Sequence, residues 1–328
     1  MIGHGDSLTF EEALRRVVDE DAALSSTDLY ALSAPSLAEI GLFRSEWPAV
    51  SDGRRQEIVT LLVENAEANF ELDFNALFRL MLEDDQAEVR TLSLKGLWED
   101  DEPTLIAPLV GILQYDAAAA ARAEAASLLG RFLLKAELEE ITPRHVVPAR
   151  TALLEVIDDP DEHVIVQRRA VESIAYLSED FVQDIIAAAY ESTDEVMRIS
   201  AVFAMGRSMD ATWAETVLAE LSNRNAAMRC EAARACGELE IKEAISAVIG
   251  LVSDADREVQ AAAIEALGQI GGQRARRVLE RCCRSEDDAL QAAAEDALSE
   301  LLLGQQPLDL FVYAPGVGED DEDIADEL

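Results

Sequence analysis

The stretch that decides the fold runs from Glu258 to Gly272 and reads EVQAAAIEALGQIGG. Val259, Ala263 and Leu267 fall four residues apart, and therefore on one face of a helix. The Ser-Asp-Ala-Asp turn before it offers short polar side chains that can cap such a helix. Its closing glycines can adopt the left-handed conformation that ends a helix. We predict that this stretch is the second helix of a two-helix unit.

The pattern recurs along the chain with a period near 31 residues. Each copy has an anchor residue about one helical turn after the polar turn, and successive anchors lie 32, 46, 30, 31, 31 and 31 residues apart. A small or β-branched residue follows three positions after every anchor, and glycine follows eight positions after four of them. A degenerate earlier copy anchors on Arg55. The regular anchors are Arg90, Arg122, Arg168, Arg198, Arg229, Gln260 and Gln291.

A fixed period that contains two helices is typical of an α-solenoid, because a single hairpin cannot bury its apolar face alone. The alternative, one long amphipathic helix or coiled coil, conflicts with the turn signals in each period. We expect an all-α fold: a right-handed superhelix of about eight stacked helical hairpins. Residues 1–72 should form an irregular helical N-terminal cap, 73–303 the repeat array, and 304–328 a C-terminal extension.

Two segments depart from the period. The 46-residue spacing predicts an insertion near 134–148, which holds Pro143 and Pro148 and so cannot be one uninterrupted helix. It is either a binding element or a passive spacer. The apolar stretch PLDLFVYAP at 307–315 is expected to cap the last repeat, or else to be a short exposed binding strand. Seven of the last ten residues are acidic, which predicts a disordered tail.

The repeats resemble a known family. DADREVQAAAIEALGQIG at 254–271 and STDEVMRISAVFAMG at 192–206 are similar to the HEAT-like repeats of the bacterial bilin-lyase type. The resemblance covers about residues 73–303 and implies the solenoid fold in a bacterial protein. It implies no single task, because such repeats serve many functions. In repeats of this type the second helices usually line the concave side, where we expect a partner to bind.

The chain is strongly acidic, with 66 Asp and Glu against 27 Lys and Arg and a net charge of -39. Nucleic acids and anionic membranes are disfavoured as partners, because both are bound through Lys and Arg. A protein or peptide partner remains, and a basic one suits the charge. No apolar run approaches the ~20 residues of a membrane helix, and the start lacks signal-peptide features. The four cysteines form no disulfide framework, so a cytoplasmic location is expected.

Catalytic and metal chemistry finds little support in the sequence. The deoxyhypusine hydroxylases, di-iron enzymes with a related repeat, carry His-Glu pairs where this chain has Ala123-Glu124 and Cys230-Glu231. Without imidazoles that ligand set is incomplete, so both glutamates are interpreted as solvated helix residues. Cys236 is expected in the core, whereas Cys230 could be exposed and mildly reactive. We expect no catalytic residue, no metal and no cofactor.

The sequence favours a non-catalytic scaffold that binds a partner protein or peptide on its solenoid surface. The alternative is a bilin-lyase-like enzyme or enzyme subunit, although no residue singles out a tetrapyrrole site. Trp98, Tyr176 and Phe203 lie near the exposed edge of second helices and are candidate anchors for a partner, since aromatic residues dominate binding hot spots. They could instead fill gaps where glycine or alanine is absent.

A second candidate site is a basic stripe on one face of a first helix. It is either a solvated face that pairs with Glu280 and Glu286 or a surface that binds an acidic segment, one choice being the chain's own tail. The five anchor arginines are predicted to be structural, because similar repeats often bond such groups between neighbours. The basic stripe comprises Arg274, Arg277, Arg281 and Arg284.

Overall fold

The structure is a computed structural model that describes residues 8–305, and every regular element in that range is helical. The chain starts with α1 (Phe10–Val18) and α2 (Ser26–Tyr30) and continues as eight helical hairpins. The first helices are α3 (Leu37–Glu46), α5 (Asn75–Met81), α7 (Ile106–Tyr115), α9 (Val147–Asp158), α11 (Phe181–Tyr190), α13 (Ala214–Glu220), α15 (Ile245–Leu251) and α17 (Gly272–Cys282). The second helices are α4 (Asp52–Ala68), α6 (Ala87–Gly96), α8 (Ala119–Glu137), α10 (Val164–Ile174), α12 (Glu195–Arg207), α14 (Ala226–Glu238), α16 (Arg257–Ile270) and α18 (Asp288–Gln305).

Short 3₁₀ turns join or extend several of these helices. They are η1 (Trp47–Ala49), η2 (Leu97–Glu99), η3 (Pro103–Leu105), η4 (Pro143–His145), η5 (Ala211–Trp213) and η6 (Lys242–Ala244). The predictions for the 307–315 stretch, the acidic tail and the first seven residues lie outside the described part of the chain.

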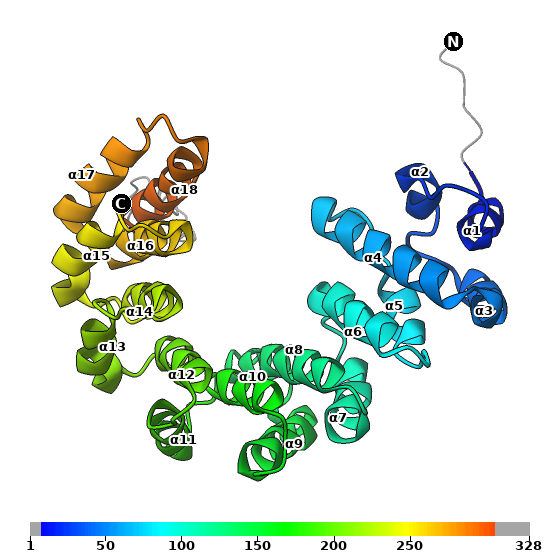
Figure 1. The fold of residues 1–328 in the computed structure, drawn as a ribbon, viewed down its shortest axis with the longest axis horizontal. Helices are drawn as coiled ribbons and strands as arrows, with labels where there is room; N and C mark the ends of the chain where they lie inside the picture. Colours follow the sequence, from blue (N-terminus) through cyan, green and yellow to red (C-terminus); the bar gives the residue numbers. More distant parts are fainter. Residues whose placement is uncertain (1–7, 306–328) are drawn as a thin grey trace, which may run out of the picture.

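The hairpins stack into an open arch (Figure 1). The second helices, α4 to α18, form its inner row, and the first helices, α3 to α17, form its outer row. Successive second helices pack directly on one another, most extensively α14 on α16 and α8 on α10. The predicted all-α solenoid of about eight hairpins is confirmed, and its concave side is lined by second helices.

Short polar side chains start the second helices, as the turn pattern indicates. Asp256 precedes α16 and accepts hydrogen bonds from the backbone N–H groups of Glu258 and Val259 at 2.9 and 3.3 Å. Asp194 caps α12 and Asn225 caps α14 in the same way. Gly271 ends α16 with φ at +71°, a conformation that favours glycine. Local sequence therefore sets the helix boundaries in each of these repeats.

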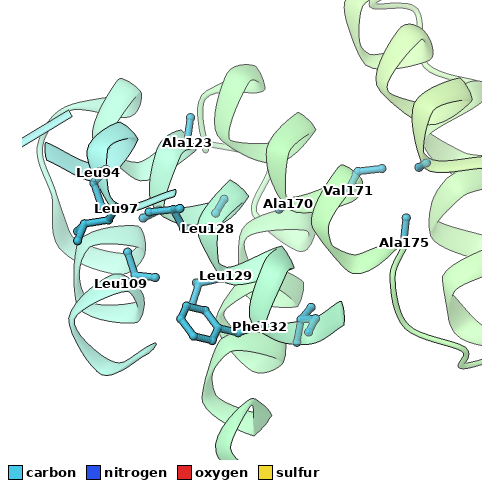
Figure 2. Packing of buried hydrophobic residues seen from close by; sticks show 14 of the residues in the cluster. Leu94, Leu97, Leu109, Ala123, Leu128, Leu129, Phe132, Ala170, Val171 and Ala175 are labelled. Atoms are coloured by element: carbon cyan, nitrogen blue, oxygen red, sulfur yellow. The ribbon is translucent and has the colours of Figure 1, made fainter. Parts of the chain in front are cut away.

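The core is one continuous layer between the two rows of helices. Val259, Ala263 and Leu267 of the deciding stretch are fully buried, as predicted. Figure 2 shows the same layer farther along the arch, where Leu94 and Leu97 approach Leu128 and Leu129 of α8. Each hairpin thus buries its apolar face against its neighbours, which is the physical basis of a solenoid.

Glycine at the eighth position after the anchor allows second helices to approach closely. A Cβ added at Gly237 would lie 2.9 Å from the Cα of Ala266 in the next second helix. One added at Gly206 would lie 2.9 Å from the Cα of Ala235, and one at Gly268 would lie 2.9 Å from the carbonyl oxygen of Ala297. These three glycines lie where helix backbones meet, so a larger residue would force the helices apart.

The segment predicted as an insertion, 134–148, lengthens a helix and forms a surface turn. Helix α8 continues to Glu137, about one turn beyond the boundary expected near 134. Glu139 then adopts φ +61° before η4, and Pro148 falls in the first turn of α9. The insertion is thus helical at its start and exposed at its tip, where Leu138 is 59% exposed.

Candidate functional site

Three anchor arginines join neighbouring repeats through paired hydrogen bonds. The guanidinium of Arg90 donates to both carboxylate oxygens of Asp116, each at 2.7 Å. Arg122 donates to Glu162 at 2.9 and 2.6 Å, and Arg229 donates to Asp254 at 2.9 and 2.7 Å. Every acceptor lies in the turn that precedes the next second helix. We call this series of pairs the arginine ladder.

The remaining guanidinium nitrogen of each ladder arginine holds its own turn. Arg90 Nη1 donates to the carbonyl oxygen of Asp84 at 2.8 Å, and Arg122 Nη1 donates to that of Asp116 at 2.7 Å. Arg229 Nη1 donates to the carbonyl oxygen of Asn223 at 2.9 Å. One side chain therefore fixes a turn and its attachment to the next repeat, which supports the structural role proposed for the anchors.

The ladder is interrupted at the middle of the array. Ser192 and Asn223 occupy the turn positions at which the three ladder pairs have the carboxylates of Asp116, Glu162 and Asp254. Without that acceptor, Arg168 donates instead to the Ser200 hydroxyl at 2.9 Å. Arg198 keeps the bond to its own turn and donates to the Ser192 carbonyl oxygen at 3.1 Å. The interruption involves Arg168 on α10 and Arg198 on α12, two neighbouring helices of the inner row.

Two of the three candidate aromatic anchors lie together, and the third lies apart. The Arg207 guanidinium carbon lies 5.0 Å from the centre of the Phe203 ring. Tyr176 is half-buried near the same arginine: burial raises the pKa of its phenol, and the charge of Arg207 opposes that rise. Trp98, 39% exposed, instead contacts Phe70 edge to face in an earlier repeat.

Ion pairs surround the two central aromatic residues on α10, α12 and α14. Arg207 lies 3.2 Å from Glu238, which belongs to the next second helix. Within single helices, Arg234 pairs with Glu231 at 2.9 Å and Arg169 pairs with Glu172 at 2.6 Å. All three helices belong to the inner row (Figure 1). We define the central cluster as Arg169, Glu172, Tyr176, Phe203, Arg207, Glu231, Arg234 and Glu238.

The central cluster holds polar atoms that the described residues leave without a partner. Glu231 Oε2 and Arg207 Nε are inaccessible to solvent and form no hydrogen bond within residues 8–305. Burial raises the pKa of both Glu231 and Glu238, and the charges of Arg234 and Arg207 only partly oppose it. Buried polar atoms without a partner cost roughly 1–3 kcal/mol each. These two atoms therefore reduce what the central cluster contributes to stability.

The interpretation of Glu231 as a solvated residue is wrong. Its side chain is 18% exposed, because α14 packs closely between its neighbours, whereas the side chain of Glu124 is 33% exposed. Arg207, Arg234 and Glu238 were not predicted as site residues. A signal was present, since Glu231, Arg234 and Glu238 are spaced three and four residues apart on one helix face.

The cysteines offer no reactive site. Cys230 is 3% exposed, and burial raises the pKa of its thiol to about 11, so the suggestion that it is exposed and reactive is wrong. Packing of α14 on α16 covers it, and its thiol lies 3.7 Å from the Glu258 carbonyl oxygen. Cys236 is fully buried, which confirms its place in the core. Cys282 is buried as well, and Cys283 is half-buried.

Residues 8–305 contain no group of three or more His, Cys, Asp or Glu placed to hold a metal ion. At the positions that would match the di-iron repeat, Ala123 and Cys230 are buried core residues, so this chain does not fit that metal centre. In the same part of the chain, no helix combines the length and the apolar character that crossing a membrane requires.

The basic stripe is exposed on and just after α17. Arg274 donates to the Ser246 hydroxyl at 3.1 Å, while Arg277, Arg281 and Arg284 form no ion pair with another described residue. Glu280, expected as a partner of the stripe, pairs instead with Arg276 at 2.8 Å. The stripe belongs to α17 in the outer row, whereas the central cluster belongs to α10, α12 and α14 in the inner row (Figure 1). The two candidate sites are therefore separate surfaces.

Comparison with known proteins identifies the repeat. Residues 214–299 match the family model described as HEAT repeats, and a search of curated proteins finds no match. YibA from Escherichia coli is 16% identical, with 86% of this chain and 99% of that chain covered and a TM-score of 0.45. Importin beta is 13% identical over 89% of this chain and 46% of that one, with a TM-score of 0.44. Human deoxyhypusine hydroxylase is 15% identical over 90% and 96%, with a TM-score of 0.36.

Proposed function

We propose that this HEAT-like repeat protein is a non-catalytic scaffold that binds a partner protein or peptide on the concave side of its arch. The observation that carries the proposal is the central cluster. It places two half-buried aromatic rings, three ion pairs and two unpartnered polar atoms on three successive helices of the inner row and the turn after the first of them. Aromatic and arginine side chains surrounded by packed neighbours are typical of binding hot spots.

The charges of the central cluster suit a polypeptide. Its three arginines and three glutamates balance each other, although the whole chain carries a net charge of -39. A ligand that fits here must supply both hydrogen-bond donors and acceptors, as every peptide unit does. Basic residues elsewhere in the partner would match the acidic surface around the cluster. A cytoplasmic location belongs to the same proposal, since a reducing compartment suits the four free cysteines.

The proposal is tested by partner capture with a matched pair of variants. Tagged wild-type protein, Phe203→Ala/Arg207→Ala and Tyr115→Ala are each used to capture proteins from a lysate of the source organism, at low and at moderate salt. Tyr115 is the control because its aromatic ring is 82% exposed on the outer row. We expect one stoichiometric partner that survives moderate salt, is retained by Tyr115→Ala and is lost from the double variant.

Two results would contradict the proposal. If only basic proteins are captured and all are released as salt rises, the acidic surface attracts them without specificity. If the double variant is as well folded as the wild type and retains the same partner, the partner does not bind at the central cluster. A metal or pigment that co-purifies in stoichiometric amount would contradict the non-catalytic part of the proposal.

A further inference from the structure

The basic stripe is a concentrated positive surface on a very acidic protein. Arg277, Arg281 and Arg284 are exposed and form no ion pair within residues 8–305, where the chain has 22 ion pairs in all. On α17, Arg274, Arg277 and Arg281 recur at spacings of three and four, so like charges face one another, which is unfavourable in an isolated helix. Such an arrangement is relieved when an anion lies across it.

On the side of α15, the stripe has no anion beside it. Helix α15 packs beside α17 and reads ISAVIGL, without a single charged residue. Its exposed positions, Ser246, Ala247 and Gly250, are small and neutral. The nearest carboxylate on α17 itself, Glu280, is paired with Arg276. The stripe therefore borders a neutral surface along α15, and acidic residues begin only after it, at Glu286.

The chain's last segment is suitably placed to reach this surface. Residues 306–328 follow α18, which packs against α17 in the last hairpin. A Cβ at Gly271 would lie 3.1 Å from Leu301, so the later part of α18 runs beside the start of α17. The 13 residues from 306 to 318 can span roughly 40 Å, whereas the 11 residues of α17 are about 16 Å long. Every arginine of the stripe is thus within reach.

We propose that residues 319–328 of the chain dock on the basic stripe. This segment, EDDEDIADEL, carries seven carboxylates for the four guanidinium groups. Hydrogen bonds between arginine and carboxylate are strong because both groups are charged. Tethering keeps the segment at an effective concentration on the order of millimolar, so weak individual contacts suffice. The docked segment covers the stripe and excludes other polyanions from it. The inference is independent of the central cluster.

The test uses a fluorescent synthetic peptide of residues 316–328, the full chain, and a chain truncated after Gly318. We expect the peptide to bind the truncated chain with an affinity that falls as salt rises. Binding to the full chain should be about tenfold weaker, because its own tail occupies the stripe. In the truncated chain, Arg277→Glu/Arg281→Glu should abolish binding. The control Arg144→Glu/Arg224→Glu, which changes the net charge equally at two other exposed arginines, should retain it.

Three results would overturn the proposal. Equal binding to the full and truncated chains would mean that the tail does not occupy the stripe. Equal loss in the two charge variants would mean that the peptide senses only net charge. No binding to the truncated chain would mean that the stripe does not recognise the tail. A second measurement needs no charge variant: phenylglyoxal should modify Arg277 and Arg281 several-fold faster in the truncated chain, and equal rates would also overturn the proposal.

Discussion

At the scale of single residues, the glycine that follows each anchor by eight positions decides how closely repeats pack. A methyl group at Gly237 would lie 2.9 Å from the Cα of Ala266, a backbone atom that cannot move alone. We expect Gly237→Ala to lower the free energy of unfolding by about 1–3 kcal/mol, the usual cost of overpacking a core. Urea denaturation followed by circular dichroism measures it.

Gly111 is the matched control, because it is also a helical glycine but has open space around it. A Cβ at Gly111 meets no heavy atom within 4 Å. Gly111→Ala should therefore raise the free energy of unfolding by about 0.5–1 kcal/mol through helix propensity. The packing argument fails if both substitutions change stability in the same direction.

The recurring glycines and Cys230 show which features of single residues can be predicted from the sequence and which cannot. The recurrence of Gly206, Gly237 and Gly268 was visible, but the reason for it required the neighbouring helix. Cys230 follows its anchor by one residue, where helical spacing leaves exposure open, and only the packing of α14 on α16 buries it. A sequence predicts which side chains share one face of a helix, but it does not predict how deeply the neighbouring helices bury each of them.

At the scale of elements, the arginine ladder joins one repeat to the next. Arg229 and Asp254 are 17% and 10% exposed in their side chains and share two short hydrogen bonds. Asp254→Asn removes the charge and one of these bonds. We expect the free energy of unfolding at pH 7 to fall by about 1.5–3 kcal/mol, the usual value for hydrogen bonds to charged groups. Asp161→Asn, at an exposed turn carboxylate without an ion pair, should change it little.

The effect of Asp254→Asn must depend on pH. Arg229 holds the pKa of Asp254 below its ordinary value of 3.8. The carboxylate therefore stabilises the fold fully above that value, and the stabilisation is lost as the pH falls through the lower pKa of the folded state. The wild type and the variant should converge in stability in acid and separate as the pH rises to 5. A difference that is constant from pH 7 to pH 3 would contradict the charge argument.

Helix boundaries were well predicted wherever capping residues are present. Asp194, Asn225 and Asp256 mark the starts of second helices in the sequence and in the structure. The prediction failed at the end of α8, which passes through Gly130 and continues to Glu137, because no proline follows before Pro143. The two prolines farther on exclude one long helix, but they do not tell where the first part ends.

At the scale of the whole molecule, the stacked hairpins follow from the period, but the shape of the arch does not. Curvature adds up from a small rotation at each repeat, and these rotations depend on side-chain packing between helices. The central cluster escaped prediction for a similar reason. Arg207 and Glu238 lie 31 residues apart and form a pair only because α12 and α14 stack. Side-chain contacts between repeats are therefore the part of the site that could not be predicted from the sequence.

The two arms of the arch carry like charges. Helix α4 on one arm has the exposed residues Glu64 and Glu67, and α18 on the other has Glu295 and Glu300 (Figure 1). A solenoid resists bending weakly, because each repeat contacts only its neighbours and small rotations accumulate. Repulsion between the arms can therefore change how far the arch opens, provided that solvent ions do not screen it.

Salt should close the arch. The Debye length falls from about 30 Å at 0.01 M to about 8 Å at 0.15 M, so charges on the two arms repel each other much less at the higher ionic strength. We expect the radius of gyration from small-angle X-ray scattering to decrease between these two conditions and to change little at higher salt. The helical content from circular dichroism should stay constant, since closure needs only rotations between repeats. A radius of gyration that is independent of salt would mean that packing alone, as in the contact of Gly237 with Ala266, sets the opening.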